Sequence, residues 1–321
     1  MKFISESDAA RLVTIDQAID LMEVLFLSLE GDDVVLFPVV MGANSDGLGR
    51  FGVKSGLIRS RRLLGLKVGS YFPQNPARGL PSHGSTTLLL DDATGLPTAL
   101  VSSAWLTALR TAAADGVAVR RLSNPDAEVV AIVGAGHQAW FDLLAVRAVR
   151  TVREVRVWAR EPAKAERFAC RARDELGLAA WAADLPAALR GAQIVVCGTA
   201  AREPLVRREW IDPGAHISAM GADGPGKQEL DIELVATARL FADVVAQSVA
   251  IGEFEAAARA GRIEASIITP LGEALRDPTH GRHTPDEITI FDSSGIAVQD
   301  LAIADFALRA AGASARDLAS A

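Results

Sequence analysis

The chain has 321 residues, of which 50% are hydrophobic and 23% are charged, and its formal net charge is −7. This length and composition can supply a sizeable core in one large or two medium domains, which excludes a largely disordered protein. The acidic balance is opposite to that of most nucleic-acid-binding proteins, and no run reaches 18 apolar residues, so we expect neither nucleic acid nor membrane as a partner.

The two cysteines, Cys170 and Cys197, form no Cys-x-x-Cys pair, and the N-terminus has no apolar signal core. Cys170 falls in a predicted helix and Cys197 in a predicted buried strand. We therefore expect free thiols in the core of a cytoplasmic protein.

The first hundred residues predict one helix followed by several strands. Thr14 is the expected start of an amphipathic helix, and Gly31 is its expected stop. Strand-like runs follow at 34–37, 52–54, 64–68 and 86–90, separated by Gly, Pro and Asn turns. Residues 91–95 fit a hairpin loop that leads into a strand over 98–101. This region is predicted to be α+β, with a mostly antiparallel sheet.

A helix that Ser102 or Ser103 caps is predicted to run to Leu122, and 124–126 form a linker. The following order is strand 129–133, helix 137–148, strand 154–158, helix 162–176, helix 185–190 and strand 193–197. Such alternation predicts a parallel sheet with right-handed crossovers. Apolar runs at 215–219 and 239–242 extend the sheet, 289–292 form a last strand, and 296–311 form an apolar helix.

The strand over 129–133 runs directly into a Gly-x-Gly-x-x-Ala motif. Gly134 permits a tight turn, Gly136 lets the backbone approach a pyrophosphate, and Ala139 lets the helix pack close to the strand. The helix N-terminus then offers free N–H groups to the phosphates. The pattern predicts a dinucleotide site, although a Gly-rich turn of another α/β protein would share the glycines.

The end of the second nucleotide-domain strand bears on the choice of cofactor. A carboxylate at this point binds the ribose hydroxyls of NAD, whereas an arginine can bind the extra phosphate of NADP. Here the strand tip carries no carboxylate, Arg160 follows it, and Glu161 comes one residue later. The residues alone leave both NAD and NADP open.

Three cations have two interpretations each. Lys67 lies inside an apolar strand, where a lysine either protects a sheet edge or binds an anion in a cleft, and Lys54 shares this ambiguity. Arg110 lies among small residues of a helix, so it either binds a carboxylate in bidentate fashion or is an ordinary surface arginine.

Asp223 is surrounded by glycines after a strand-like run. At the mouth of a parallel sheet such a carboxylate can face a ligand, although most Asp residues in Gly/Pro loops are turn or cap residues. His83 and His137 are ambiguous between site and structure. The five scattered histidines show no metal-ligand spacing, and no Ser/His/Asp signature supports a hydrolase.

Five motifs together resemble the ornithine cyclodeaminase/mu-crystallin family, in family order and over nearly the whole chain. They are Asn-Pro-Ala-Arg-Gly-Leu-Pro at 75–81, Ala-Leu-Arg-Thr-Ala-Ala at 108–113, Gly-Ala-Gly-His-Gln-Ala at 134–139, Gly-Ala-Asp-Gly-Pro-Gly-Lys at 221–227 and Phe-Asp-Ser-Ser-Gly at 291–295. The resemblance implies an α/β fold in which a Rossmann dinucleotide-binding domain, 116–295, is inserted into an α+β substrate and dimerisation domain, 1–115 and 296–321. It also implies a homodimer through the sheet of that outer domain.

The resemblance assigns roles residue by residue. Lys67 matches the lysine that binds the substrate α-carboxylate, Arg110 matches its partner arginine, and Asp223 matches the acid beside the substrate nitrogen. Thr199 and 293–295 match loops that line the nicotinamide. The residues expected to bind the cofactor are Gly134, Ala135, Gly136, His137, Gln138, Arg160, Thr199, Thr111, Ser293 and Gly295.

Two departures from the family pattern affect the substrate. Many members carry an arginine after a Pro-Pro pair near residue 39, where this chain has Pro38-Val39. The cyclodeaminases carry a glutamate near residue 53, where this chain has Lys54. A lysine in a partly dry cleft disfavours a second ammonium group and favours a second carboxylate, which Lys54, with Ser55 or His83, would bind. With the segments at 54–56 (Lys-Ser-Gly) and 69–71 (Gly-Ser-Tyr), the chain looks closest to the iminosuccinate reductase branch.

The resulting expectation is an imino-acid reductase that uses NAD, or NADP as the alternative, to convert iminosuccinate into aspartate. Lys67 and Arg110 would hold the α-carboxylate, and Asp223 would stabilise or protonate the imine nitrogen, because only the iminium is a good hydride acceptor. The alternatives are an ornithine cyclodeaminase, an alanine dehydrogenase, and a mu-crystallin-like binding protein that is not an enzyme.

Overall fold

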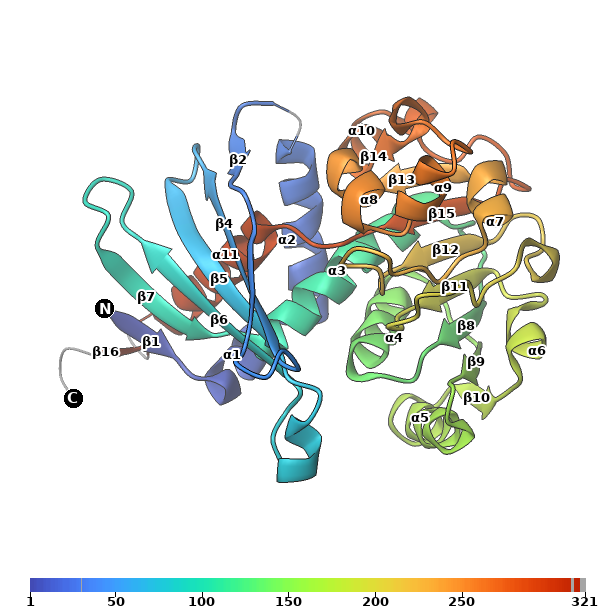
Figure 1. The fold of residues 1–321 in the computed structure, drawn as a ribbon, viewed down its shortest axis with the longest axis horizontal. Helices are drawn as coiled ribbons and strands as arrows, with labels where there is room; N and C mark the ends of the chain where they lie inside the picture. Colours follow the sequence, from blue (N-terminus) through green and yellow to red (C-terminus); the bar gives the residue numbers. More distant parts are fainter. Residues whose placement is uncertain (30, 313–314, 318–321) are drawn as a thin grey trace. The chain divides into compact units, whose positions relative to one another are not determined.

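The computed structural model describes residues 1–29, 31–312 and 315–317 and divides into two compact units (Figure 1). The first unit comprises Met1–Arg110 with Ile296–Ala321, and the second comprises Thr111–Gly295. The chain first passes between them within the single helix α3 (Ala104–Leu122), which also contains the expected boundary at 115/116. Residues 313–314 and 318–321 of the expected outer domain lie outside the described residues.

The first unit is built on an eight-stranded mixed sheet with the order β16-β1-β7-β6-β5-β4-β2, and β3 pairs with β4. Its pairs are antiparallel except β1 with β7, so the predicted mostly antiparallel sheet is present. The elements of this unit are β1 (Lys2–Ile4), α1 (Glu6–Leu12), α2 (Ile15–Ser28), β2 (Val34–Leu36), β3 (Val40–Ala43), β4 (Arg50–Ile58), β5 (Leu63–Tyr71), η1 (Asn75–Arg78), β6 (His83–Leu90), β7 (Pro97–Ser102), α11 (Ala297–Ala311) and β16 (Arg316–Asp317).

The two faces of this sheet differ, because strand side chains alternate between them. One face is buried and packs against α11. This close approach requires glycine: a Cβ added to Gly56 would lie 3.0 Å from Val298 Cγ1, and one added to Gly65 would lie 2.9 Å from Leu301 Cδ2. We call this the helix face and the opposite one the open face.

The second unit contains an eight-stranded sheet in which every pair is parallel, with the order β10-β9-β8-β11-β12-β15-β13-β14. The chain runs outward from β8 to β10 and then returns to β11 on the other side of β8, which is the strand order of a Rossmann sheet. Ligands of such sheets bind where this order reverses, at the carboxyl ends of the strands.

Beyond α3, the elements of the second unit are β8 (Val129–Val133), α4 (His137–Val149), β9 (Glu154–Trp158), α5 (Pro162–Leu176), β10 (Ala179–Ala182), α6 (Leu185–Leu189), β11 (Ile194–Cys197), η2 (Arg208–Trp210), β12 (His216–Ala219), α7 (Ile232–Thr237), β13 (Arg239–Ala242), α8 (Val245–Ile251), α9 (Glu255–Arg259), η3 (Ala265–Ile267), β14 (Thr269–Pro270), α10 (Leu271–Arg276), η4 (Pro278–His280) and β15 (Thr289–Asp292).

The predicted elements of this unit are present, but two other expectations need correction. Helix α2 ends at Ser28, three residues before the expected stop at Gly31. Cys197 is buried in β11 as expected, but Cys170 is only half-buried on α5, so it is a free thiol near the surface rather than in the core. Within the described ranges, no helix is both long and apolar enough to cross a membrane.

Candidate functional site

The first unit gathers three charged side chains from distant parts of the chain. Lys67 on β5 is 6% exposed, and its Nζ lies 2.9 Å from Asp300 Oδ1 on α11. Arg110 Nε on α3 lies 3.0 Å from the same oxygen, and Arg110 Nη1 donates to Gln299 Oε1 at 3.1 Å. The structure therefore brings the predicted pair Lys67 and Arg110 onto one buried carboxylate.

Lys54 belongs to the same group because of the strand register. It lies directly opposite Lys67 across β4 and β5, so the two side chains share the helix face with Cβ atoms roughly 5 Å apart. Thr107 Oγ1 lies 3.5 Å from Lys67 Nζ and bonds to Ser85 Oγ at 3.0 Å. We call Lys54, Lys67, Arg110 and Asp300 the cation cluster.

The electrostatics of the cluster favour an added anion. Burial lowers the pKa of Lys67 to about 8; the carboxylate of Asp300 opposes this shift, and Arg110 and Lys54 add to it. Burial alone would raise the pKa of Asp300, but Arg110 and Lys67 hold it below its usual value. Three cations thus act on the Asp300 carboxylate, and their positive potential favours the approach of a small anion.

The other two predicted substrate residues lie apart from this cluster. Ser55 follows Lys54 in an extended strand, so its side chain points to the open face, away from Lys67. His83 lies on the helix face but pairs with Tyr71 at the strand end, roughly 13 Å along the strands from Lys67. The centroids of the His83 and Tyr71 rings lie 4.7 Å apart, and the ring planes are tilted by 38°. Of the three residues expected around the second carboxylate, only Lys54 lies beside Lys67.

In the second unit, the dinucleotide motif has the geometry that a phosphate group requires. Gly134 has a φ of +105°, and a Cβ there would lie 2.7 Å from Thr199 Cγ2, so only glycine fits. Gly136 caps α4 without a side-chain hydrogen bond, and a Cβ there would meet only open space. The N-terminal N–H groups of α4 are therefore accessible to phosphates, and the observed strand, turn and helix fit a dinucleotide.

The predicted second-strand residues lie at the tip of β9. Arg160 is exposed two residues after the strand, and Glu161 precedes α5 and pairs with Lys164 at 2.7 Å. Thr111, another expected cofactor residue, is half-buried on α3. These positions fit either nicotinamide cofactor.

The loops after β11, β12 and β15 hold the remaining predicted residues. Thr199 follows β11, and Asp223 is exposed in the loop after β12, where its carboxylate pairs with Lys227. Ser293 Oγ and Gly295 N both donate to Asp243 Oδ2 at 2.9 Å, which fixes the loop after β15. All of these loops leave the carboxyl edge of one parallel sheet.

Two buried carboxylates that the sequence did not single out organise these sites. Asp300 neutralises Lys67 and Arg110, and Glu229 joins the loops after β11 and β12. The signal for Asp300 was an acid in a mostly apolar helix that also carries Asp305, and the signal for Glu229 was an acid two residues after Lys227. Neither position reveals its partner.

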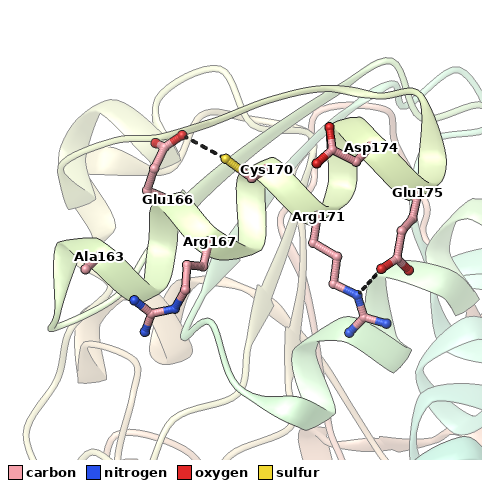
Figure 2. A pocket seen from close by; sticks show the side chains of 7 residues that line it. All are labelled: Ala163, Glu166, Arg167, Cys170, Arg171, Asp174 and Glu175. Atoms are coloured by element: carbon pink, nitrogen blue, oxygen red, sulfur yellow. Dashed lines mark hydrogen bonds and ion pairs between the residues drawn. The ribbon is translucent and has the colours of Figure 1, made fainter.

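A shallow hollow runs along the surface of α5 and is lined by side chains of that helix alone (Figure 2). The Cys170 thiol donates to Glu166 at 3.5 Å, and Arg171 pairs with Glu175 at 2.9 Å. None of the predicted site residues lines it. In the described part of the chain, no group of three or more His, Cys, Asp or Glu side chains is arranged to hold a metal ion.

Comparison with known proteins connects these features. The sequence profile of the ornithine cyclodeaminase/mu-crystallin family matches residues 2–311. The chain belongs to this family. It is 40% identical over 304 residues to an iminosuccinate reductase of Paracoccus denitrificans, covering 95% of this chain and 94% of that protein. The predicted family is thereby confirmed.

Solved structures of relatives share the whole fold. The Paracoccus denitrificans iminosuccinate reductase in complex with NAD+ superposes with a TM-score of 0.91 at 38% identity, covering 97% of this chain and 96% of that one. An archaeal alanine dehydrogenase dimer with bound NAD gives 0.91 at 32% identity, covering 97% and 96%. Thermococcus litoralis Δ1-pyrroline-2-carboxylate reductase with NADH and L-proline gives 0.92 at 31% identity, covering 97% of each chain. The family includes NAD-dependent oxidoreductases of amino and imino acids.

Proposed function

We propose that this protein is an NAD-dependent imino-acid reductase whose substrate is an α-imino dicarboxylate, iminosuccinate, and whose product is aspartate. The observation that carries the proposal is the cation cluster, in which Lys54 lies directly opposite Lys67. Lys67 and Arg110 suffice for one carboxylate, and the position of Lys54 beside them suits a substrate with a second carboxylate. The relative that reduces iminosuccinate supports the same substrate.

The cofactor would lie at the carboxyl edge of the second unit's sheet. Gly134, Gly136 and the α4 N-terminus would hold its phosphates, and Thr199 with 293–295 would border the nicotinamide. A nicotinamide bound there supplies the hydride that reduces the imine carbon. We propose NAD, because the relatives bind it; Arg160 makes NADP the alternative, and titration with NADH and NADPH distinguishes the two.

The chain's own residues would bind the substrate and manage its proton. Lys67 and Arg110 would hold the α-carboxylate, and Lys54 would hold the distal one. Asp223 would keep the imine nitrogen protonated, because the iminium is the better acceptor. Its exposed carboxylate is accessible to a ligand and pairs with Lys227.

Replacing Lys54 with methionine tests the substrate assignment. We expect kcat/KM for ammonia plus oxaloacetate to fall about 10- to 100-fold, because one carboxylate loses its cation. Activity with ammonia plus pyruvate should stay nearly constant. The matched control is Lys2→Met on β1, whose lysine pairs with Asp317 at the sheet edge. An equal loss with both keto acids would contradict the role of Lys54.

The charge of Lys67 should also make ligand binding depend on pH. Burial lowers the pKa of Lys67 to about 8, so the lysine loses its proton as the pH rises through this value. Calorimetric titration with succinate, an unreactive dicarboxylate, should show weaker binding above about pH 8. Lys67→Arg should bind independently of pH in this range, because guanidinium stays charged. A wild-type affinity that is constant from about pH 6 to 10 would contradict this account.

We further propose that the protein is a homodimer through the open face of the first unit's sheet. Many side chains on this face are apolar and half-buried or exposed, whereas several of their neighbours on the helix face, such as Lys67 and Leu89, are buried. They include Val53, Leu57, Leu64, Leu66, Val68, Leu88 and Leu90. Exposed apolar surface of this kind marks an interface. Light scattering should give twice the chain mass of 33.8 kDa, and the mass of a single chain would contradict the proposal.

A further inference from the structure

One buried carboxylate joins the loops that follow two neighbouring strands of the second unit. Glu229 is fully buried; its Oε1 accepts a hydrogen bond from Thr199 N at 2.7 Å, and its Oε2 accepts one from Gly221 N at 3.0 Å. Thr199 follows β11 and Gly221 follows β12, which are adjacent in the sheet. We call Glu229 with these two backbone partners the Glu229 bracket.

The bracket is closely fitted on both sides. A Cβ added to Gly221 would lie 2.3 Å from Thr199 O and 2.4 Å from Glu229 Oε2, so only glycine fits there. Thr199 in turn packs its methyl group against the turn at Gly134. A continuous chain of contacts therefore runs from Glu229 through Thr199 to the dinucleotide motif.

The same bracket holds the base of the loop that carries Asp223. Gly221 precedes Asp223 by two residues, its N–H donates to Glu229, and its carbonyl accepts from Lys227 Nζ at 3.2 Å. Lys227 also pairs with Asp223. The position of the Asp223 carboxylate thus depends on Gly221, whose backbone N–H and C=O groups are both hydrogen-bonded to side chains.

Glu229 is itself held by a second buried acid. The carboxylate of Glu253, which is 1% exposed, accepts hydrogen bonds from Glu229 N at 2.9 Å and from Leu230 N at 2.6 Å. Burial raises the pKa of Glu229 to about 7 and raises that of Glu253. Burying carboxylates destabilises a fold, so stability alone does not account for this arrangement.

We propose that Glu229 is a positioning residue that holds the Asp223 loop and Thr199 in one fixed arrangement with the dinucleotide motif. It acts through two backbone N–H groups and does not touch the substrate. The inference rests on the proposed function, because that function assigns Asp223 its task.

Glu229→Gln tests the inference, because glutamine keeps the shape but its NH2 group cannot accept the second N–H. We expect kcat for imine reduction to fall about 10- to 100-fold, since small displacements of reacting groups are costly. Substrate KM should change less than about threefold, because the cation cluster is intact. Amide hydrogen exchange should become faster in peptides that contain Thr199 and Gly221. Unchanged kcat together with unchanged exchange would overturn the inference.

The matched control is Glu233→Gln, the same chemical change at an exposed acid on α7 that pairs with Arg262. It should alter neither kcat nor exchange. If Glu229→Gln does not fold, Glu253→Gln takes its place, because it loosens Glu229 and leaves the bracket's carboxylate intact. Lower kcat with faster exchange at Gly221 in this variant supports the inference, and wild-type values overturn it.

The two proposals can fail separately. If the wild-type protein reduces no imine, the proposed function fails, whereas hydrogen exchange at Thr199 and Gly221 still tests whether Glu229 joins the two loops. If the wild type reduces imines and Glu229→Gln does so equally fast, only the positioning role fails.

Discussion

Replacing Asp223 with asparagine is expected to lower kcat for imine reduction about 10²- to 10⁴-fold. Asparagine has nearly the same shape, but it carries no charge to stabilise the iminium and no proton to give. NADH affinity should stay within about threefold of wild type. Most of this affinity is expected to come from contacts between the cofactor's phosphates and the N-terminus of α4, which the substitution leaves intact. Steady-state kinetics and fluorescence titration with NADH measure the two quantities.

Asp174→Asn is the matched control, because Asp174 is an exposed aspartate on α5 of the same unit with no assigned role. It should reduce imines at the wild-type rate. A kcat within about threefold of wild type for Asp223→Asn would remove Asp223 from the mechanism.

Replacing Asp300 with asparagine is expected to lower the free energy of unfolding by about 3–5 kcal/mol. The variant leaves Lys67 and Arg110 buried without their counter-charge, beside Lys54. Since the cations hold the pKa of Asp300 below its usual value, its stabilising charge is present at neutral pH and is lost in acid. The difference in the free energy of unfolding between wild type and variant should therefore be largest at neutral pH and become smaller below about pH 4.

Chemical denaturation at several pH values measures this effect, and Asp305→Asn is its control. Asp305 lies on the same helix and pairs with Arg309 at 2.9 Å near the surface, so its loss should cost less than about 1 kcal/mol. Equal denaturation midpoints for the two variants would show that Asp300 is not the counter-charge of the cation cluster.

The sequence predicted the second unit most completely, because its strand and helix patterns alternate along the chain. The strands over 129–133 and 154–158 have the predicted bounds, as does the helix over 162–176. The same local signals, a strand, two glycines and a helix start, locate the dinucleotide motif. These features depend on neighbours in the chain, which a single sequence displays directly.

The counter-charges could not be predicted, because they depend on residues far apart in the chain. Lys67 and Asp300 are 233 positions apart, and Thr199 and Glu229 are 30 apart. The parallel pairing of β1 with β7 could not be predicted either, because these strands are also far apart in the chain. In addition, β1 has only three residues, which is too short for a clear strand pattern. Ser55 differs: strict alternation along a strand would already have separated it from Lys54.

The measurement that tests the proposed function most directly is NADH oxidation by the purified protein with ammonia plus oxaloacetate, compared with ammonia plus pyruvate. Both mixtures form their imine in solution. We expect one aspartate per NADH oxidised and a kcat/KM at least about tenfold higher for the oxaloacetate mixture, because only its imine engages Lys54. A preference for pyruvate would contradict the dicarboxylate assignment and indicate an alanine dehydrogenase. No oxidation with either mixture, together with ammonia release from ornithine, would indicate a cyclodeaminase.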